Sequence, residues 1–181
     1  MKNRQDIYRM VLTAVAAAVL CVLGPLSIPI GIVPISFTNF ALFISLYALG
    51  MKNGTYGYII YLLIGLTGVP VFSNFSGGIG KLLGPTGGYL IGMIFTAVIA
   101  GLFIDRFLNK KILCFLGMVI GALVYYLFGS AWLSYQGHMS IAQSLSVGVI
   151  PFIPGDLAKI LIVALIGPKI RKRLTESRVD S

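Results

Sequence analysis

The chain has 181 residues, of which 57% are hydrophobic and only 10% charged, and its formal net charge is +9. Soluble domains carry about 25% charged residues because their surfaces face water, so this composition excludes an ordinary soluble protein and indicates a surface that faces lipid. The positive charge does not indicate nucleic-acid binding, because the basic residues lie between apolar runs and form no stripe interleaved with aromatic residues. We therefore expect one transmembrane domain over residues 1–181, located in the cell membrane, with no nucleic-acid partner.

The chain offers few residues for metal or nucleophile chemistry. Its two cysteines, Cys21 and Cys114, each stand inside an apolar run, and His138 is the only histidine. A metal site or a histidine-based catalytic triad would be hard to assemble from this set. We expect no catalytic residues, no metal and no cofactor, so the protein is not predicted to be an enzyme.

Apolar segments recur along the whole chain. A transmembrane helix needs roughly 20 predominantly apolar residues, and glycine–proline pairs and polar turns separate the segments from one another. The sequence predicts an all-α integral membrane protein, a bundle of six helices over residues 7–23, 34–50, 55–69, 86–104, 112–132 and 141–170, the last broken near 151–155.

The first segment has a basic head and an apolar stretch, which is typical of a signal peptide. No convincing cleavage site follows it, and five more apolar segments do, so we interpret it as an uncleaved first helix. Residues 24–34 contain three prolines and predict an irregular loop, whereas Lys52-Asn53-Gly54 predicts a tight turn between the second and third helices.

A glycine-rich stretch joins the third and fourth helices. Seven glycines lie between Gly77 and Gly92, which allows close approach of the backbone to a ligand or a loop that folds back into the protein. A flexible external loop explains the composition equally well. The stretch lacks the pattern of a phosphate-binding loop, so it gives no support for nucleotide binding.

The distribution of lysine and arginine predicts the orientation. If the N-terminus is cytoplasmic, twelve of the fourteen lysines and arginines lie in cytoplasmic segments, Lys81 lies outside and Lys159 lies within a span. Cytoplasmic loops of membrane proteins carry such an excess of basic residues. The sequence therefore predicts that both termini are cytoplasmic and that the glycine-rich loop is external or re-entrant.

Asp156 and Lys159 are charged residues in an otherwise apolar segment, PFIPGDLAKILIVALIGP. A charge at membrane depth costs a few kcal/mol and marks a functional site by default, and residues three apart share one helix face. A helix from Asp156 to about Ile170 would be roughly 22 Å long, too short to span alone, so its N-terminus would lie below the surface and point at a ligand. The alternative is that Asp156 is a helix N-cap that Lys159 neutralises.

Small residues mark the first helix. Ala14 and Ala18 lie one turn apart, and such spacing allows another helix to approach closely. Packing within the bundle explains this spacing equally well.

Three motifs together resemble one family: GLTGVPVF from Gly65 to Phe72, GPTGGYL from Gly84 to Leu90, and PFIPGDLAK from Pro151 to Lys159. They are similar to the BioY family, the biotin-specific substrate-binding (S) components of energy-coupling-factor (ECF) transporters, and the resemblance covers nearly the whole chain. It implies the S-component fold, with biotin as the substrate bound near the extracellular side. It also implies that the Ala14 and Ala18 face docks on a transmembrane coupling protein served by two ATPase subunits.

Biotin carries an anionic valerate, a ureido group and an apolar sulfur ring, so its site needs a cation, an acceptor and aromatic walls. We expect Lys159 to bind the carboxylate and Asp156 to accept from the ureido N–H groups. Further candidate substrate-binding residues are two polar side chains, four aromatic side chains and the threonine of the GPTGGYL motif: Asn74, Gln136, Phe37, Phe75, Tyr89, Tyr135 and Thr86.

Other function classes fit the sequence less well. An intramembrane enzyme would show a second carboxylate, a serine–histidine pair or a metal cluster at depth, and a structural membrane protein would not explain Asp156 and Lys159. An S component for another small anionic vitamin, or a solitary proton-coupled carrier that uses Asp156, stays open as an alternative.

Overall fold

The structure is a computed structural model that describes residues 2–29 and 31–179, with side chains described for residues 6–29 and 31–174. The side chains of Lys2, Arg4 and Arg178, which enter the charge count, therefore lie outside the described residues. In chain order the elements are α1 (Lys2–Leu23), β1 (Ser27–Ile28), β2 (Ile35–Ser36), α2 (Thr38–Leu66), α3 (Ile79–Leu83), α4 (Gly87–Arg106), α5 (Lys111–Gln136), α6 (Ile141–Gly148), the 3₁₀ turn η1 (Ile150–Phe152) and α7 (Ile153–Val179).

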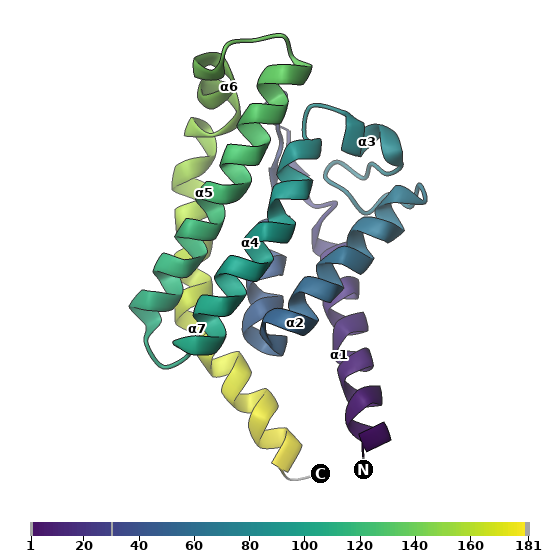
Figure 1. Ribbon diagram of the computed structural model, residues 1–181, viewed down its shortest axis with the longest axis vertical. Coiled ribbons are helices and arrows are strands. Elements are labelled where there is room, and N and C mark those ends of the chain that lie inside the picture. The colour runs from purple at the N-terminus through teal and green to yellow at the C-terminus, as the bar shows by residue number, and fades with distance from the viewer. Residues whose placement is uncertain (1, 30, 180–181) are drawn as a thin grey trace.

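The long helices form a bundle in which both termini lie at the same end, while α3 and α6 lie at the opposite end (Figure 1). The most extensive packing is between α4 and α5, followed by the packing of α2 on α4 and on α1. Within the described residues, four helical segments are long and apolar enough to cross a membrane: Asp6–Leu23, Gly87–Arg106, Lys111–Gln136 and Ile141–Leu174. The prediction of a helical membrane protein is therefore confirmed.

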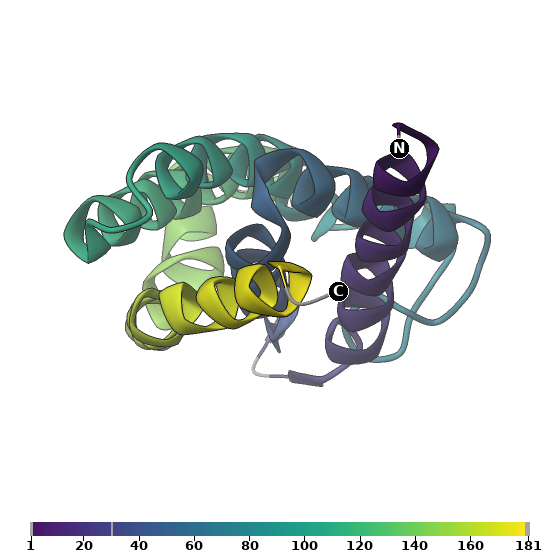
Figure 2. The same cartoon turned by 90° about the horizontal axis from the view of Figure 1, so that it is seen from below.

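Helix α1 lies at one side of the bundle and packs against α2 (Figure 2). Ala16 and Ala17 are buried in this contact, whereas Ala14 and Ala18 are exposed. A glycine in α2 makes the approach possible, because a Cβ atom at Gly57 would lie only 2.5 Å from the Cβ of Ala16. The small residues of α1 thus present two faces, one packed and one open.

Helix α2 corresponds to the two predicted helices over 34–50 and 55–69, but the turn predicted at residues 52–54 is absent. The break is the single residue Gly50, with φ 80° and ψ 170°, a conformation that glycine adopts without steric cost. The chain becomes helical again at once, because the Met51 N–H donates to Oδ2 of Asp105 at 2.9 Å. Nη1 of Arg171 contacts the other oxygen of Asp105 at 2.6 Å. One carboxylate therefore joins α2, α4 and α7.

The loops at the opposite end contain more structure than the sequence predicts. In the proline-rich segment, β1 and β2 form a short antiparallel pair with Ser27 opposite Ser36. In the glycine-rich stretch, the ring of Phe72 is fully buried and lies edge-on to Tyr61 at 5.5 Å between centroids. Because Phe72 anchors it to the core, this stretch is not simply a flexible external loop.

The C-terminal segment is broken between α6 and α7, where η1 intervenes. Helix α7 begins at Ile153, earlier than the predicted Asp156, and runs on through Pro168. Its 27 residues give a length of about 40 Å, so the prediction of a helix too short to span is wrong. The helix stays against the bundle at Gly167, where a Cβ atom would lie 2.5 Å from the ring of Tyr47.

Candidate functional site

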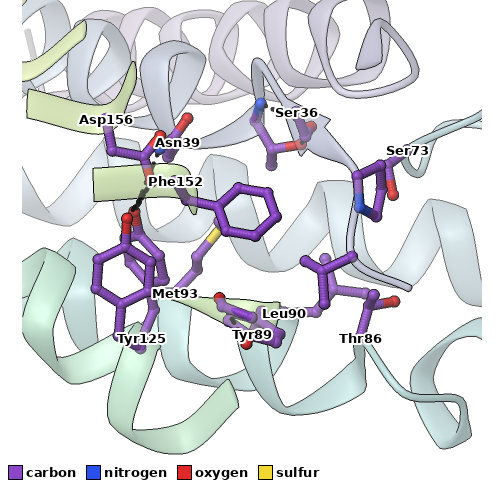
Figure 3. A pocket seen from close by; sticks show the side chains of 15 residues that line it. Ser36, Asn39, Ser73, Thr86, Tyr89, Leu90, Met93, Tyr125, Phe152 and Asp156 are labelled. Carbon is purple, nitrogen blue, oxygen red and sulfur yellow. Dashed lines mark hydrogen bonds between the residues drawn. The ribbon is translucent and has the colours of Figure 1, made fainter. Parts of the chain in front are cut away.

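The candidate site is a pocket near the end of the molecule that carries α6, at some distance from the termini. Helices α2 and α7 contribute residues of their first turns, α4 contributes residues of its first two turns, and α5 contributes two residues from its middle. The pocket is lined by Val33, Pro34, Ser36, Thr38, Asn39, Ser73, Thr86, Tyr89, Leu90, Met93, Tyr125, Tyr126, Gly148, Phe152 and Asp156. Figure 3 shows the pocket from close by.

Asp156 is the one charged residue of this lining, and only 6% of it is exposed. The hydroxyl groups of Tyr125 and Tyr126 both donate to its Oδ2, at 2.5 and 2.6 Å. Lys159 Nζ donates to the other oxygen, Oδ1, at 3.1 Å. A buried carboxylate is tolerated only when it is paired and hydrogen-bonded, and these three donors meet that need.

Lys159 lies beside the pocket, and its ammonium group is fully used. Nζ donates to the carbonyl oxygen of Ser36 at 2.7 Å and to Oδ1 of Asn39 at 3.3 Å, in addition to Asp156. An ammonium group has three donors and no acceptor, so these three acceptors account for all of them. Lys159 therefore joins α7 to the start of α2.

Asn39 and Tyr125 connect the two sides of this cluster. The side-chain amide of Asn39 donates to the Tyr125 hydroxyl at 3.3 Å. Asp156, Lys159, Asn39 and the two tyrosines form one hydrogen-bonded network, which we call the Asp156 network. Networks of this kind, fully satisfied at low dielectric, hold their members in one arrangement.

The network also bears on the alternative interpretation of Asp156 as an N-cap. Helix α7 begins at Ile153, which places Asp156 in its first turn, and the carboxylate accepts from hydroxyl groups of α5. Lys159 does pair with it, as that interpretation requires. The carboxylate is thus held by tertiary contacts rather than by the end of its own helix.

The middle of the pocket is apolar. Figure 3 shows Phe152, Met93 and Leu90 between the Asp156 network on one side and Ser73 and Thr86 on the other.

Tyr89 presents its ring to the same middle region. Its hydroxyl donates to the carbonyl oxygen of Gly148 at 2.8 Å, so the polar end of this side chain is satisfied by protein. The pocket therefore has two polar ends separated by an apolar waist.

The structure brings together only some of the residues predicted from the sequence. Asp156, Thr86 and Tyr89 line the pocket, and Lys159 contacts it through Asp156. The ring of Phe37 lies 5.5 Å from Lys159 Nζ, on the outer side of the network.

The other predicted residues lie outside the lining. Phe75 and Tyr135 are 67% and 76% exposed. The side chain of Gln136 donates to the carbonyl oxygen of Leu83. Asn74 ties two loops together, because its Oδ1 accepts from the Ser27 hydroxyl at 2.7 Å and its N–H donates back to that hydroxyl at 2.8 Å.

Sequence reasoning missed the residues that hold Asp156. Asn39, Tyr125 and Tyr126 were not among the predicted site residues, although each is a polar side chain in an apolar span. A carboxylate at membrane depth requires hydrogen-bond donors from neighbouring helices. Polar side chains in the other apolar spans are therefore candidate partners of Asp156.

Comparison with known proteins agrees with this geometry. Residues 1–176 match the BioY family. The biotin transporter BioY of Thermotoga maritima is 39% identical over 148 residues, which are 81% of this chain and 86% of that protein. The biotin transporter BioY of Lactococcus lactis is 32% identical over 181 aligned positions, covering 96% of this chain and 95% of that one.

A solved structure is similar throughout. The crystal structure of the S-component for biotin from an ECF-type ABC transporter superposes with a TM-score of 0.86 at 31% identity and covers 95% of each chain. By sequence and by fold, the chain belongs to the BioY family.

Proposed function

We propose that this chain is a high-affinity biotin-binding membrane subunit for vitamin uptake, energised by an ATP-hydrolysing ECF module on separate chains. The observation that carries the proposal is the pocket, in which a buried carboxylate paired with a lysine stands at one end of an apolar waist. Its similarity to relatives named as biotin transporters and to an S-component for biotin supports the same assignment.

The ureido group of biotin is chemically matched to the Asp156 network. Each edge of a cyclic urea offers an N–H donor beside a carbonyl acceptor. Oδ2 of Asp156 already accepts two hydroxyl donors, whereas Oδ1 accepts only from Lys159 and keeps a lone pair for an N–H group. Lys159, whose three donors are all used by Ser36, Asn39 and Asp156, holds this carboxylate in place for the ureido edge.

The fused ring and the alkyl chain of biotin fit the apolar waist of Phe152, Met93, Leu90 and the Tyr89 ring. Burying such surface contributes about 25 cal/mol per Å². We assign Phe37 to supporting Lys159 and Asn74 to holding the loops over the pocket.

We assign Phe75, Tyr135 and Gln136 to the rim of the site, where each lies at the same end of the molecule as the pocket. Their contact with ligand is part of the proposal and depends on movement of the loops. The hydroxyl of Thr86 lies at the second polar end.

The test is direct binding. The protein, purified in detergent from cells grown with biotin, should release one biotin per chain, identified by mass spectrometry, and the emptied protein should rebind it in a calorimetric titration. Release of a different small anionic vitamin would support the rival S-component assignment and contradict this one.

We also propose six membrane passes with both termini in the cytoplasm. Support comes from the break at Gly50, which divides α2 into one half that leads toward the end with the termini and one half that leads back (Figure 1). Together with α1, α4, α5 and α7, the two halves would give six passes, and the bias of basic residues supports termini on the inner side.

Single cysteines should report this topology in a chain whose Cys21 and Cys114 are replaced by serine. Helix α5, 26 residues long, separates Asn109 from His138 by about 39 Å. In intact cells, a membrane-impermeant maleimide should label His138→Cys and should label Asn109→Cys only after the membrane is opened. Labelling of both from outside would contradict the topology.

We further propose that the exposed Ala14 and Ala18 face of α1 docks on the transmembrane coupling protein, which two ATPase subunits serve. These alanines point away from Gly57, the α2 residue against which α1 packs. The face therefore remains open to a partner helix, which small residues allow to approach closely.

A further inference from the structure

A groove lies between α1 and the second half of α2 (residues 51–66), at the end of the molecule that carries both termini and faces the viewer in Figure 2. Its volume is about 940 Å³, which is at the upper end of the range for small-molecule sites. Among the described residues, the groove and the biotin pocket share no lining residue. The groove is therefore a separate candidate site.

Both walls of the groove begin with a cation and continue with groups that carry no charge. On α2, Lys52, Tyr56 and Ile60 are spaced four apart and all line the groove, so they form one stripe on the helix. Tyr56 is 58% and Ile60 38% exposed. On α1, Arg9 lies one turn before Thr13, whose hydroxyl donates to the Arg9 carbonyl oxygen at 2.9 Å and is thus satisfied within the helix. The groove is cationic near the termini and apolar farther into the bundle.

The charges of the lining leave two cations available to a ligand. Three basic residues and two carboxylates line the groove, which gives a net charge of +1. Arg171 and Asp105 pair with each other at 2.6 Å. Within the described part of the chain, Arg9 and Lys52 form no ion pair, and Asp6 is the remaining acidic residue of the lining. An anion bound at Arg9 and Lys52 would therefore meet an excess of positive charge.

The position of the groove indicates what kind of anion fits it. Helix α1 is long and apolar enough to cross a membrane, so a groove along it continues from the headgroup region into the region of the acyl chains. The proposed topology places this end at the inner leaflet, whose anionic headgroups attract lysine and arginine. A phospholipid has the same order as the groove, with a charged head followed by apolar chains.

We propose that this groove binds one phospholipid of the inner leaflet with an anionic headgroup. Arg9 and Lys52 bind the headgroup phosphate, and an acyl chain lies along Tyr56 and Ile60. The assignment to the inner leaflet rests on the proposed function, which includes the topology, whereas the preference for an anionic lipid rests on the groove alone.

Lipid titration tests the site. The full chain, purified in detergent and depleted of lipid, is titrated with phosphatidylglycerol, which is anionic, or phosphatidylcholine, which is zwitterionic, and the bound lipid is counted by native mass spectrometry. We expect one phosphatidylglycerol per chain, bound about tenfold more tightly than phosphatidylcholine. Excess inorganic phosphate should not displace it, because phosphate has no apolar part to fill the groove.

The double variant Arg9→Gln and Lys52→Gln removes both available cations and should weaken phosphatidylglycerol binding about 30-fold. The matched control is Lys110→Gln with Lys111→Gln. These two lysines are exposed, lie at the same end of the molecule between α4 and α5, and are absent from the lining of the groove. The control loses the same charge and should bind the lipid as tightly as wild type. Both variants should bind biotin normally, since the pocket is distant.

Several results would overturn the proposal. Absence of bound phosphatidylglycerol, equal affinity for the two lipids, or displacement by inorganic phosphate would each show that the groove is not a site for an anionic phospholipid. Equal weakening in the two double variants would show that the lipid responds only to the overall charge of this end.

A further result would assign the groove to a protein. If the Arg9 and Lys52 variant binds phosphatidylglycerol as wild type does but no longer pulls down the coupling protein, the groove belongs to that partner's docking surface and the lipid assignment is wrong. Failure of the wild-type protein to bind biotin would contradict the proposed function and leave the lipid measurement unaffected.

Discussion

Replacing Asp156 by asparagine should lower the affinity for biotin about 100-fold, a loss of roughly 3 kcal/mol. The ligand loses a charged acceptor in a buried site, and two tyrosine hydroxyls and the Lys159 ammonium lose the partner that they share. The measurement is a calorimetric titration of biotin in detergent. The same variant should also unfold at a lower temperature, because breaking a buried ion pair leaves an uncompensated charge and costs about 3–5 kcal/mol.

A double variant separates the two effects. Asp156→Asn combined with Lys159→Met removes both charges, and replacement of a buried pair by groups of similar volume is often neutral for stability. We therefore expect the double variant to recover most of the unfolding temperature without recovering affinity. Recovery of both would show that the pair has a structural role and does not contact biotin.

The tyrosines provide a graded form of the same experiment. Tyr126→Phe removes one of the two hydroxyl donors to Oδ2 and should weaken biotin binding about tenfold, the value of one hydrogen bond to a charged group. The matched control is Tyr56→Phe, since Tyr56 is exposed on α2 and lies in the groove near the termini. Equal effects of the two variants would contradict a specific role for Tyr126.

Hydropathy predicted the helical class and most helix positions because the bilayer imposes one length on every span. It failed where a contact distant in sequence decides the local structure. The polar run at residues 52–54 reads as a turn, but the chain breaks at Gly50 instead and is helical again from Met51, whose N–H donates to Asp105. In the same way Pro168 reads as a helix end, whereas α7 continues to Val179.

Some residues of the site can likewise be identified from the sequence, and others only from the structure. Asp156 and Lys159 stood out because charge is rare in an apolar span, and the GPTGGYL motif led to Thr86 and Tyr89. Tyr125 and Tyr126 could not be identified from the sequence in this way, since aromatic residues in membrane helices are usually core or interface residues. Only the three-dimensional arrangement shows that both hydroxyls converge on one carboxylate oxygen about 30 residues away in the sequence.

The arrangement of the molecule also separates binding from coupling. The pocket lies near the end that carries α6, whereas Ala14 and Ala18 lie on α1, at one side of the bundle (Figure 2). Ala14 lines a groove near the termini, with Met10, Thr13 and Tyr56 as neighbours. Variants of α1 should therefore affect uptake without changing the ligand site.

Replacing both Ala14 and Ala18 by tryptophan should reduce biotin uptake in cells that contain the ECF module to the level of cells without the transporter. Both alanines are exposed, so the large rings do not enter the bundle, but they prevent a partner helix from approaching closely. Biotin affinity of the purified variant should stay within about threefold of wild type, and pull-down of the coupling protein should fail.

The control places the same bulk on another face of the same helix. Val15 is exposed and lies roughly 80° around α1 from the middle of the Ala14 and Ala18 face, so its replacement by tryptophan should preserve uptake, because lipid accommodates the ring. Ala17→Trp, by contrast, should unfold the protein, since Ala17 is buried against α2. If the Ala14 and Ala18 variant loses biotin binding along with uptake, the face packs within the protein. If uptake is unchanged, the coupling protein docks elsewhere on the surface.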